Sequence, residues 1–172
     1  MPTLEVTRDI VPAGFQDDLD VAVEDAFAWQ DVIANIEDAK KADGALYSLA
    51  NKALYLVVFE SERADDADPA VIAELDRAAH GEAARLKPEN LLHYFDGTPD
   101  ADGRSRSWCL WTDDESAREA VAGPKHQEAR SRAPEIYKHY AVKLFSVIPH
   151  DEGIVFVPHF HPTNAIRRGD NA

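Results

Sequence analysis

His126 is the residue of this sequence best placed to carry out chemistry. It follows the pair Gly123-Pro124, which ends one helical run and starts another, because proline lacks the amide donor and clashes with the preceding turn. At 100° per residue, His126 shares a stripe of the second run with Ala129, Ala133, Ile136, Tyr137 and Tyr140. A histidine on the buried side of a helix can accept or donate a proton, and burial favours its neutral form. His126 is therefore our candidate acid or base, and the alternative is a core histidine bonded to a carbonyl or a tyrosine.

Aromatic and polar residues of the neighbouring segments are candidates for the wall of a ligand cavity beside His126. Ligand pockets are mostly apolar and aromatic, with a few polar groups. Glu82 interrupts an apolar helical stripe, either as a pocket carboxylate with a raised pKa or as a side chain whose stem packs while its head reaches water. The alternative for the aromatic residues is that they form plain core. The candidate ligand-binding residues are His93, Tyr94, Trp108, Trp111, Tyr137 and Glu82.

Four strands are expected near residues 53–60, 91–96, 105–111 and 142–148. The first, ALYLVVF, is apolar without alternation, which is typical of an interior strand covered on both faces. The third alternates Cys109 and Trp111 on one face with Trp108 and Leu110 on the other, which predicts two different buried faces. The sequence therefore predicts a sheet whose central strands are covered from both sides.

Two helices are expected between these strands. Asp68 and Pro69 form an N-cap and a first helical position, and the helix continues to about Leu86. Asp113 or Asp114 begins the second helix, which Gly123-Pro124 divides. The order strand, helix, strand, strand, helix, strand predicts an α+β protein with a ferredoxin-like βαββαβ antiparallel sheet over residues 53–149, with both helices on one face.

Further segments precede and follow this core. Residues 20–41 have a helical pattern that is apolar on more than one side, which fits a helix touching two surfaces or one wide core face. We therefore expect residues 1–52 to form an N-terminal helical extension packed on the core. Residues 150–172 are expected to add a short strand at 154–157 and then an extended tail.

Composition excludes several classes of function. The formal charge of −14 argues against binding nucleic acid or an anionic membrane, because both require a basic surface. The sequence has no apolar run of membrane-spanning length and no signal-peptide pattern at its start, so we expect a cytoplasmic protein. The single cysteine, Cys109, cannot form an internal disulfide. His159 and His161 are a weak metal signal, and we predict no metal site.

The order of elements and the second helix resemble the dimeric α+β barrel superfamily, which includes antibiotic-biosynthesis monooxygenases and haem-degrading enzymes. The resemblance is carried by a third strand that ends in tryptophan and by a helix with the pattern Ala117, Ala120, Gly123-Pro124, His126 and Ala129. It implies a homodimer in which two sheets pack face to face, and a small-molecule cavity between sheet and helices. In the haem-degrading members the iron ligand lies one turn beyond the position of His126, where this chain has Arg130.

The resulting expectation is a protein that binds a small apolar or aromatic compound, as a cofactor-independent monooxygenase or an isomerase with His126 as acid or base. One alternative is a non-catalytic dimeric binding or assembly module, and a second is a haem protein, which a Soret band would reveal. The sequence does not decide whether the protein is an enzyme. The homodimer is expected because a sheet with helices on one face leaves apolar side chains on the other. The N-terminal helix is the alternative cover for that face.

Overall fold

The computed structural model describes residues 19, 21–42, 44, 46–159 and 165–167. The positions predicted for residues 1–18 and for most of the tail after residue 159 lie outside the described residues. None of the described helices is both long enough and apolar enough to cross a membrane.

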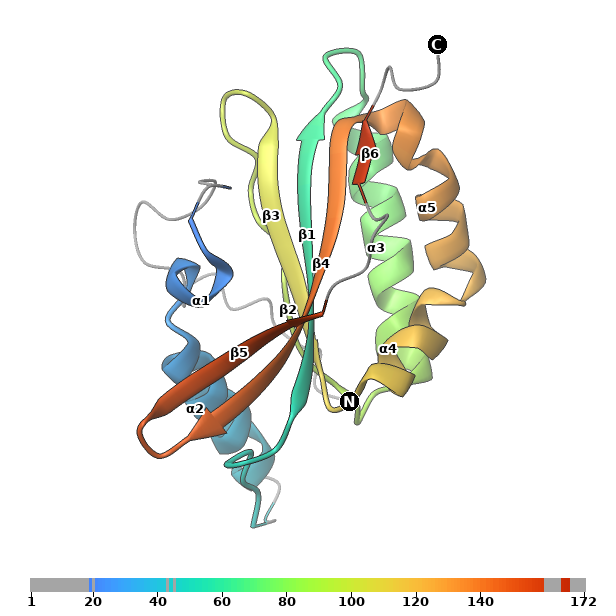
Figure 1. Cartoon of the computed structure of the whole chain (residues 1–172). Coiled ribbons are helices and arrows are strands. Elements are labelled where there is room, and N and C mark those ends of the chain that lie inside the picture. Colours follow the sequence, from blue (N-terminus) through green and yellow to red (C-terminus); the bar gives the residue numbers. More distant parts are fainter. Residues whose placement is uncertain (1–18, 20, 43, 45, 160–164, 168–172) are drawn as a thin grey trace.

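The centre of the protein is an antiparallel sheet with the order β2-β3-β1-β4-β5 (Figure 1). Its first four strands have the ferredoxin-like order, with β1 and β4 adjacent and β3 between β1 and β2. The pairs β1–β3, β1–β4 and β2–β3 are all antiparallel, as predicted. The strands are β1 (Leu54–Arg63), β2 (Leu91–Phe95), β3 (Arg104–Trp111), β4 (Tyr137–His150), β5 (Gly153–His159) and the short β6 (Ala165–Arg167), which pairs with β4.

Three helices, α3 (Pro69–Leu86), α4 (Asp114–Val121) and α5 (Pro124–Ile136), lie on one side of this sheet (Figure 1). Asp68 and Asp113 cap α3 and α4 by accepting hydrogen bonds from the amides of Ala70 and Ser116. The predicted division at Gly123-Pro124 separates α4 from α5.

One helical prediction is wrong at its end. Tyr137 and Tyr140 were placed on the stripe of His126, but α5 ends at Ile136 and both tyrosines belong to β4. The reason is the length of the β1–β4 ladder, which starts at the pair Arg63 and Tyr137 and outweighs the helical periodicity of the sequence. Both tyrosines are thereby placed in the sheet that α3 and α5 cover.

The opposite face of the sheet is covered by the N-terminal segment of the same chain. The single helix expected there is two helices, α1 (Val23–Ala26) and α2 (Trp29–Ala42), because Phe27 between them has an extended backbone. Both pack on the sheet on the side away from α3 and α5 (Figure 1). The central side chains Leu56 and Val58 are 0% exposed beneath them. The face that was expected to be open for a partner sheet is therefore closed within one chain.

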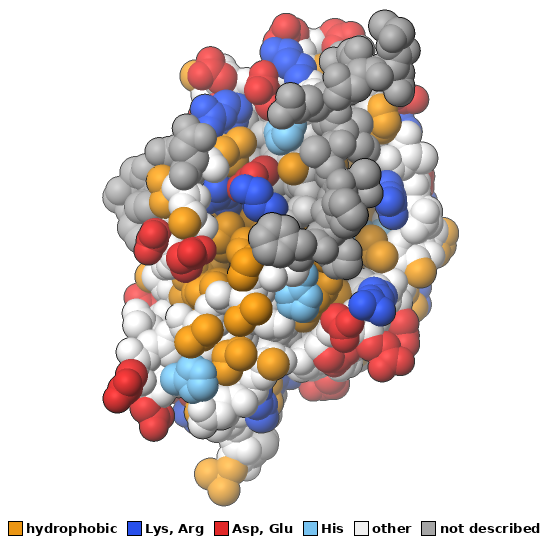
Figure 2. Space-filling view, in the orientation of Figure 1, with side chains coloured by type: hydrophobic (Ala, Val, Ile, Leu, Met, Phe, Trp, Pro, Cys, Tyr) orange, Lys and Arg blue, Asp and Glu red, His pale blue; other side chains and the backbone are white. Residues whose placement is uncertain are grey.

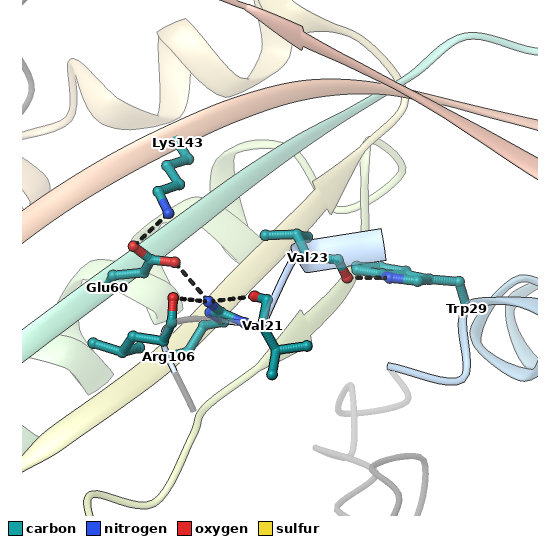
Figure 3. Close-up of polar contacts among 7 residues, drawn as sticks. Val21, Val23, Trp29, Glu60, Arg106 and Lys143 are labelled. Atoms are coloured by element: carbon teal, nitrogen blue, oxygen red, sulfur yellow. Dashed lines mark hydrogen bonds and ion pairs between the residues drawn. The ribbon is translucent and has the colours of Figure 1, made fainter. Parts of the chain in front are cut away.

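A buried ionic cluster attaches this N-terminal segment to the sheet (Figure 3). The Arg106 guanidinium donates hydrogen bonds from Nη2 to Glu60 Oε1 at 2.8 Å and to the carbonyl oxygens of Leu19 and Val21, each at 3.0 Å. Lys143 Nζ lies 2.7 Å from the other oxygen of Glu60. Glu60 and Arg106 are only 5% and 4% exposed, so both of these charges lie in the core. The cluster also attaches the start of the N-terminal segment to the sheet.

Candidate functional site

The two faces of the same central strands are packed very differently. Towards α1 and α2, Val58 and Leu110 are 0% exposed. Towards α3 and α5, their chain neighbours Val57, Phe59 and Cys109 retain accessible surface although helices lie over them. Interior side chains normally pack without gaps, so the contrast indicates that the helical layer does not close on the middle of the sheet.

This partly open space, called the sheet–helix cavity below, lies between two closed clusters. At one end Tyr55, Ala83, Leu91, Trp111, Ala117 and Ala120 are buried against each other. At the other end Ile72, Leu75 and Ile136 are buried. Between them α3 presents Asp76 and His80, four residues apart, in place of large apolar side chains. Polar residues therefore occupy positions on the helical wall that normally supply core.

Aromatic rings line the cavity on the sheet side. The imidazole of His80 stacks on the ring of Tyr94 from β2, with centroids 4.0 Å apart and planes at 21°. Tyr137 and Tyr140 of β4 stack at 5.2 Å, and Tyr140 contacts Phe59 of β1 at 6.3 Å. Such a lining, mostly aromatic with a few polar groups, is typical of small-molecule sites.

The cavity shifts the pKa values of the groups in it in one consistent direction, towards their neutral forms. Burial raises the pKa of the Cys109 thiol to about 12, and it also raises the phenol pKa of Tyr94, Tyr137 and Tyr140. Burial lowers the pKa of His80, and His126 nearby lowers it further. At pH 7 the phenols, the thiol and the imidazole are therefore neutral, and Cys109 is not an activated nucleophile.

Glu82 and His126 meet at the contact between α3 and α5, which borders the cavity. Glu82 Oε2 accepts hydrogen bonds from the backbone amides of Lys125 and His126, at 2.9 and 3.3 Å. It thus caps the start of α5, where Gly123 has no side chain to do so. The Glu82 side chain is buried, so the expectation that its head reaches water is wrong.

The helical phase predicted that His126 lies on the buried side of its helix, and the side chain is 21% exposed beside Glu82 of α3. Its Nδ1 lies 3.8 Å from Glu82 Oε2, and His80 is close enough for the charge of His126 to lower the pKa of His80. Burial lowers the pKa of His126, and the nearby Glu82 carboxylate partly opposes this shift. The His126 imidazole is therefore mostly neutral at pH 7.

The structure brings together some of the predicted site residues and separates others. Tyr94 and Tyr137 line the sheet–helix cavity, whereas Trp111 belongs to the cluster that closes one end. His93 and Trp108 lie on the opposite face of the sheet, stacked at 4.9 Å, where burial lowers the pKa of His93 to about 4. Successive residues of a strand point to opposite faces, so these two cannot share a cavity with Tyr94.

Several residues of the cavity were not singled out from the sequence as site residues. The main ones are Asp76, His80, Tyr140 and Phe59. The sequence does contain a pattern that indicates Asp76 and His80. They are polar residues four positions apart, and they adjoin the apolar stripe of Ile72, Ala79 and Ala83 on α3. Tyr140 was not predicted as a site residue because residues 137–140 were interpreted as helical.

The strand order, the antiparallel register and the helices on one face define a ferredoxin-like α+β protein with a cavity between sheet and helices. The chain belongs to the PB2B2.08-like family, which matches residues 15–157. This match includes α1 and α2, so the N-terminal cover of the sheet falls within the family unit. No curated protein matches the sequence.

Solved structures similar to this chain cover a little more than half of it. A protein of Shewanella oneidensis is 16% identical, with a TM-score of 0.46 over 56% of this chain and 92% of its own. A mutant of SnoaB, a cofactor-independent oxygenase from Streptomyces nogalater, is 17% identical, with a TM-score of 0.43 over 55% and 91%. A dimeric protein of unknown function and ferredoxin-like fold from Bacteroides fragilis is 8% identical, with a TM-score of 0.40 over 54% and 95%.

Proposed function

We propose that this protein binds a small apolar or aromatic molecule in the sheet–helix cavity. The observation that carries the proposal is the contrast between Val57, which keeps accessible surface, and Val58, which is 0% exposed in the same strand. A fully packed structural module has no reason to leave the covered face of its central strands open. Neutral phenol and imidazole groups around the cavity suit an uncharged ligand that carries one or two oxygen atoms.

The enzymatic form of this proposal is a cofactor-independent monooxygenase or an isomerase, as the superfamily resemblance implies. Either reaction requires an acid–base group beside the bound molecule. His126 has this role only if the molecule reaches the contact between α3 and α5, because its ring lies against Glu82. A haem fits poorly, since Arg130 stands at the position of the iron ligand and His126 faces a carboxylate, so we derive no step through haem.

Two adjacent valines test whether the cavity exists. Val57→Phe places a larger ring in the open space and is expected to cost less than about 1 kcal/mol of unfolding free energy, because little must move. Val58→Phe forces the same ring into closed packing and is expected to cost about 1–3 kcal/mol. Urea unfolding measures both values. Equal losses in the two variants would show that the two faces are packed alike and would remove the basis of the proposal.

The same pair tests ligand binding, with 2-naphthol as a fluorescent aromatic probe. The wild type and folded Val58→Phe are expected to bind 2-naphthol saturably, whereas Val57→Phe should bind it at least about tenfold more weakly, because the added ring fills the site. Absence of saturable binding to the wild type contradicts the proposal, and so does unchanged binding by Val57→Phe.

A homodimer remains part of the proposal, with a different interface from the one first expected. The central sheet face is closed, but β5 forms an outer edge of the sheet, where Val155 and Val157 are 46% and 45% exposed. Figure 2 shows hydrophobic side chains gathered on the part of this view where β4 and β5 lie in Figure 1. Exposed strand edges with apolar side chains favour pairing with another chain.

A native mass spectrum at micromolar concentration is therefore expected to give the mass of two chains. Replacing Val155 and Val157 together by lysine should give the mass of one chain, because charge at a strand edge opposes pairing. Leu86→Lys is the matched control, since Leu86 is 42% exposed at the end of α3 and should leave the dimer intact. A wild-type mass of one chain contradicts the homodimer.

A further inference from the structure

Asp76 is the one carboxylate that α3 points into the sheet–helix cavity from its polar wall. It lies one turn before His80, on the side of the helix that carries the buried residues Ile72 and Ala79. Among the described residues, its carboxylate has no hydrogen-bond partner and no ion pair within 4.0 Å. The Glu82 carboxylate differs in this respect, because it accepts the hydrogen bonds that cap α5.

Burial raises the pKa of Asp76 to about 6, the charge of Asp96 adds to the shift, and Arg63 opposes it. A carboxylate with this pKa is a stronger base than an ordinary aspartate and is still largely ionised at pH 7. It is therefore suited to taking a proton from a weak acid and returning it.

Three phenol groups lie near this carboxylate. Tyr94 stacks on His80, one turn of α3 from Asp76, and Tyr137 packs against the cluster of Ile72, Leu75 and Ile136 and stacks on Tyr140. Burial raises the phenol pKa of all three tyrosines, and the charge of Asp76 raises it further. Within the described part of the chain, none of their hydroxyl groups has a hydrogen-bond partner, so each is available to a ligand. The charged or titratable groups that face Asp76 and these phenols are Asp96 from the β2–β3 loop, Arg63 from β1, Cys109 from β3, His80 from α3 and Arg130 from α5.

We propose that Asp76 is the group that transfers the proton in this cavity, and that Tyr94 and Tyr137 hold the oxygen of the reacting molecule, a small apolar carbonyl compound. The inference rests on the proposed binding function of the cavity. The carboxylate takes a proton from the carbon next to the carbonyl, and the electron pair of that C–H bond forms a C=C bond. The carbonyl π pair moves to oxygen, which accepts hydrogen bonds from the neutral phenols. When the electron pair on oxygen re-forms the carbonyl, return of the proton to the same carbon gives hydrogen exchange. In a β,γ-unsaturated carbonyl compound, the shifting C=C pair takes the proton at the γ carbon instead, which completes an isomerisation with no oxidant or reductant consumed.

Position favours Asp76 over the two histidines for this step. The His126 ring lies against Glu82 at the contact between α3 and α5, and the His80 ring is stacked flat on Tyr94. Asp76 instead lies among hydroxyl groups that can stabilise the oxygen as it gains charge. Enolisation requires a base at the C–H bond and hydrogen-bond donors at the carbonyl oxygen of the same ligand.

Hydrogen exchange of a simple ketone tests the assignment. The full-length protein is incubated with 2-tetralone in D₂O, and loss of the α-proton signal is followed by NMR. The wild type is expected to accelerate exchange over buffer, with kcat/KM rising with pH through about 6 and then levelling, because the ionised carboxylate is the active form. Asp76→Asn should lose about 100-fold or more of kcat/KM, and Tyr137→Phe on the order of 10- to 100-fold.

Glu74→Gln is the matched control, since Glu74 is an exposed carboxylate on the same helix and should leave rate and pH profile unchanged. Asp76→Asn is expected to keep 2-naphthol binding, which shows that the cavity is intact. Exchange that is unaffected by Asp76→Asn, or absent in a wild type that binds 2-naphthol, overturns the role of Asp76 and leaves the binding function standing. Failure of the wild type to bind 2-naphthol overturns the proposed function and this inference with it.

Discussion

Arg106→Met is expected to lower the free energy of unfolding by about 3–5 kcal/mol, because breaking a buried ion pair leaves an uncompensated charge in the core. The methionine fills much of the volume of arginine but donates no hydrogen bond. Glu60 then stays 5% exposed with Lys143 as its one remaining ion-pair partner among the described residues. The carbonyl groups of Leu19 and Val21 lose their donor at the same time. Urea unfolding at pH 7 measures the loss.

Two further variants separate the charge from the packing. Lys143→Met removes a cation whose side chain is 47% exposed and is expected to cost no more than about 1 kcal/mol. The double variant Glu60→Leu with Arg106→Met should recover part of the loss, because replacing both partners leaves no isolated charge. If Arg106→Met costs as little as Lys143→Met, the cluster does not hold the N-terminal segment on the sheet.

The ferredoxin-like core could be predicted because its signals are local. Alternation over residues 105–111 assigned the faces of β3, and the cap at Asp68-Pro69 and the break at Gly123-Pro124 set the starts of α3 and α5. Each of these depends on residues within one turn or one strand. The order of such elements along the chain then restricts the topology to few possibilities.

The cover of the second sheet face could not be predicted in the same way. The pattern of residues 20–41 showed a helix with apolar residues on more than one side, which fits contact with a partner or with the same chain equally well. Which of the two contacts forms depends on Arg106 of β3. This residue binds the carbonyl groups of Leu19 and Val21, which lie 85 or more positions earlier in the sequence. No local pattern reports a contact between such distant residues.

The positions of the candidate residues in the fold could be predicted only in part, for a related reason. Tyr94 and Tyr137 were found by residue type and lie in the cavity, but His93 and Trp108 were grouped with them although strand alternation puts them on the other face. Asp76 was not among the predicted site residues, and a single aspartate on a helix is usually solvated. Its surroundings, three phenols from β2 and β4, come together only in the folded sheet.

Gly123→Ala is expected to cost about 2–4 kcal/mol, as the sum of a lost helix cap and a buried carboxylate without its partners. A β-carbon at this position would lie 2.4 Å from Glu82 Oε2 and 3.1 Å from the carbonyl oxygen of Ala120. The Glu82 carboxylate must therefore move away from the amides of Lys125 and His126. With its neighbouring negative charge displaced, His126 should titrate at lower pH than in the wild type, because Glu82 raises its pKa.

Gly81→Ala is the matched control, because it makes the same chemical change one residue before Glu82. A β-carbon at position 81 meets no atom within 4 Å, and alanine is a better helix former than glycine. This variant should therefore raise the free energy of unfolding by about 0.5–1 kcal/mol and leave the titration of His126 unchanged. Urea unfolding and NMR titration of the His126 ring measure the two effects. The idea is contradicted if Gly123→Ala is as stable as the wild type and leaves the pKa of His126 unchanged. In that case the Glu82 carboxylate does not need the space beside Gly123 in order to cap α5.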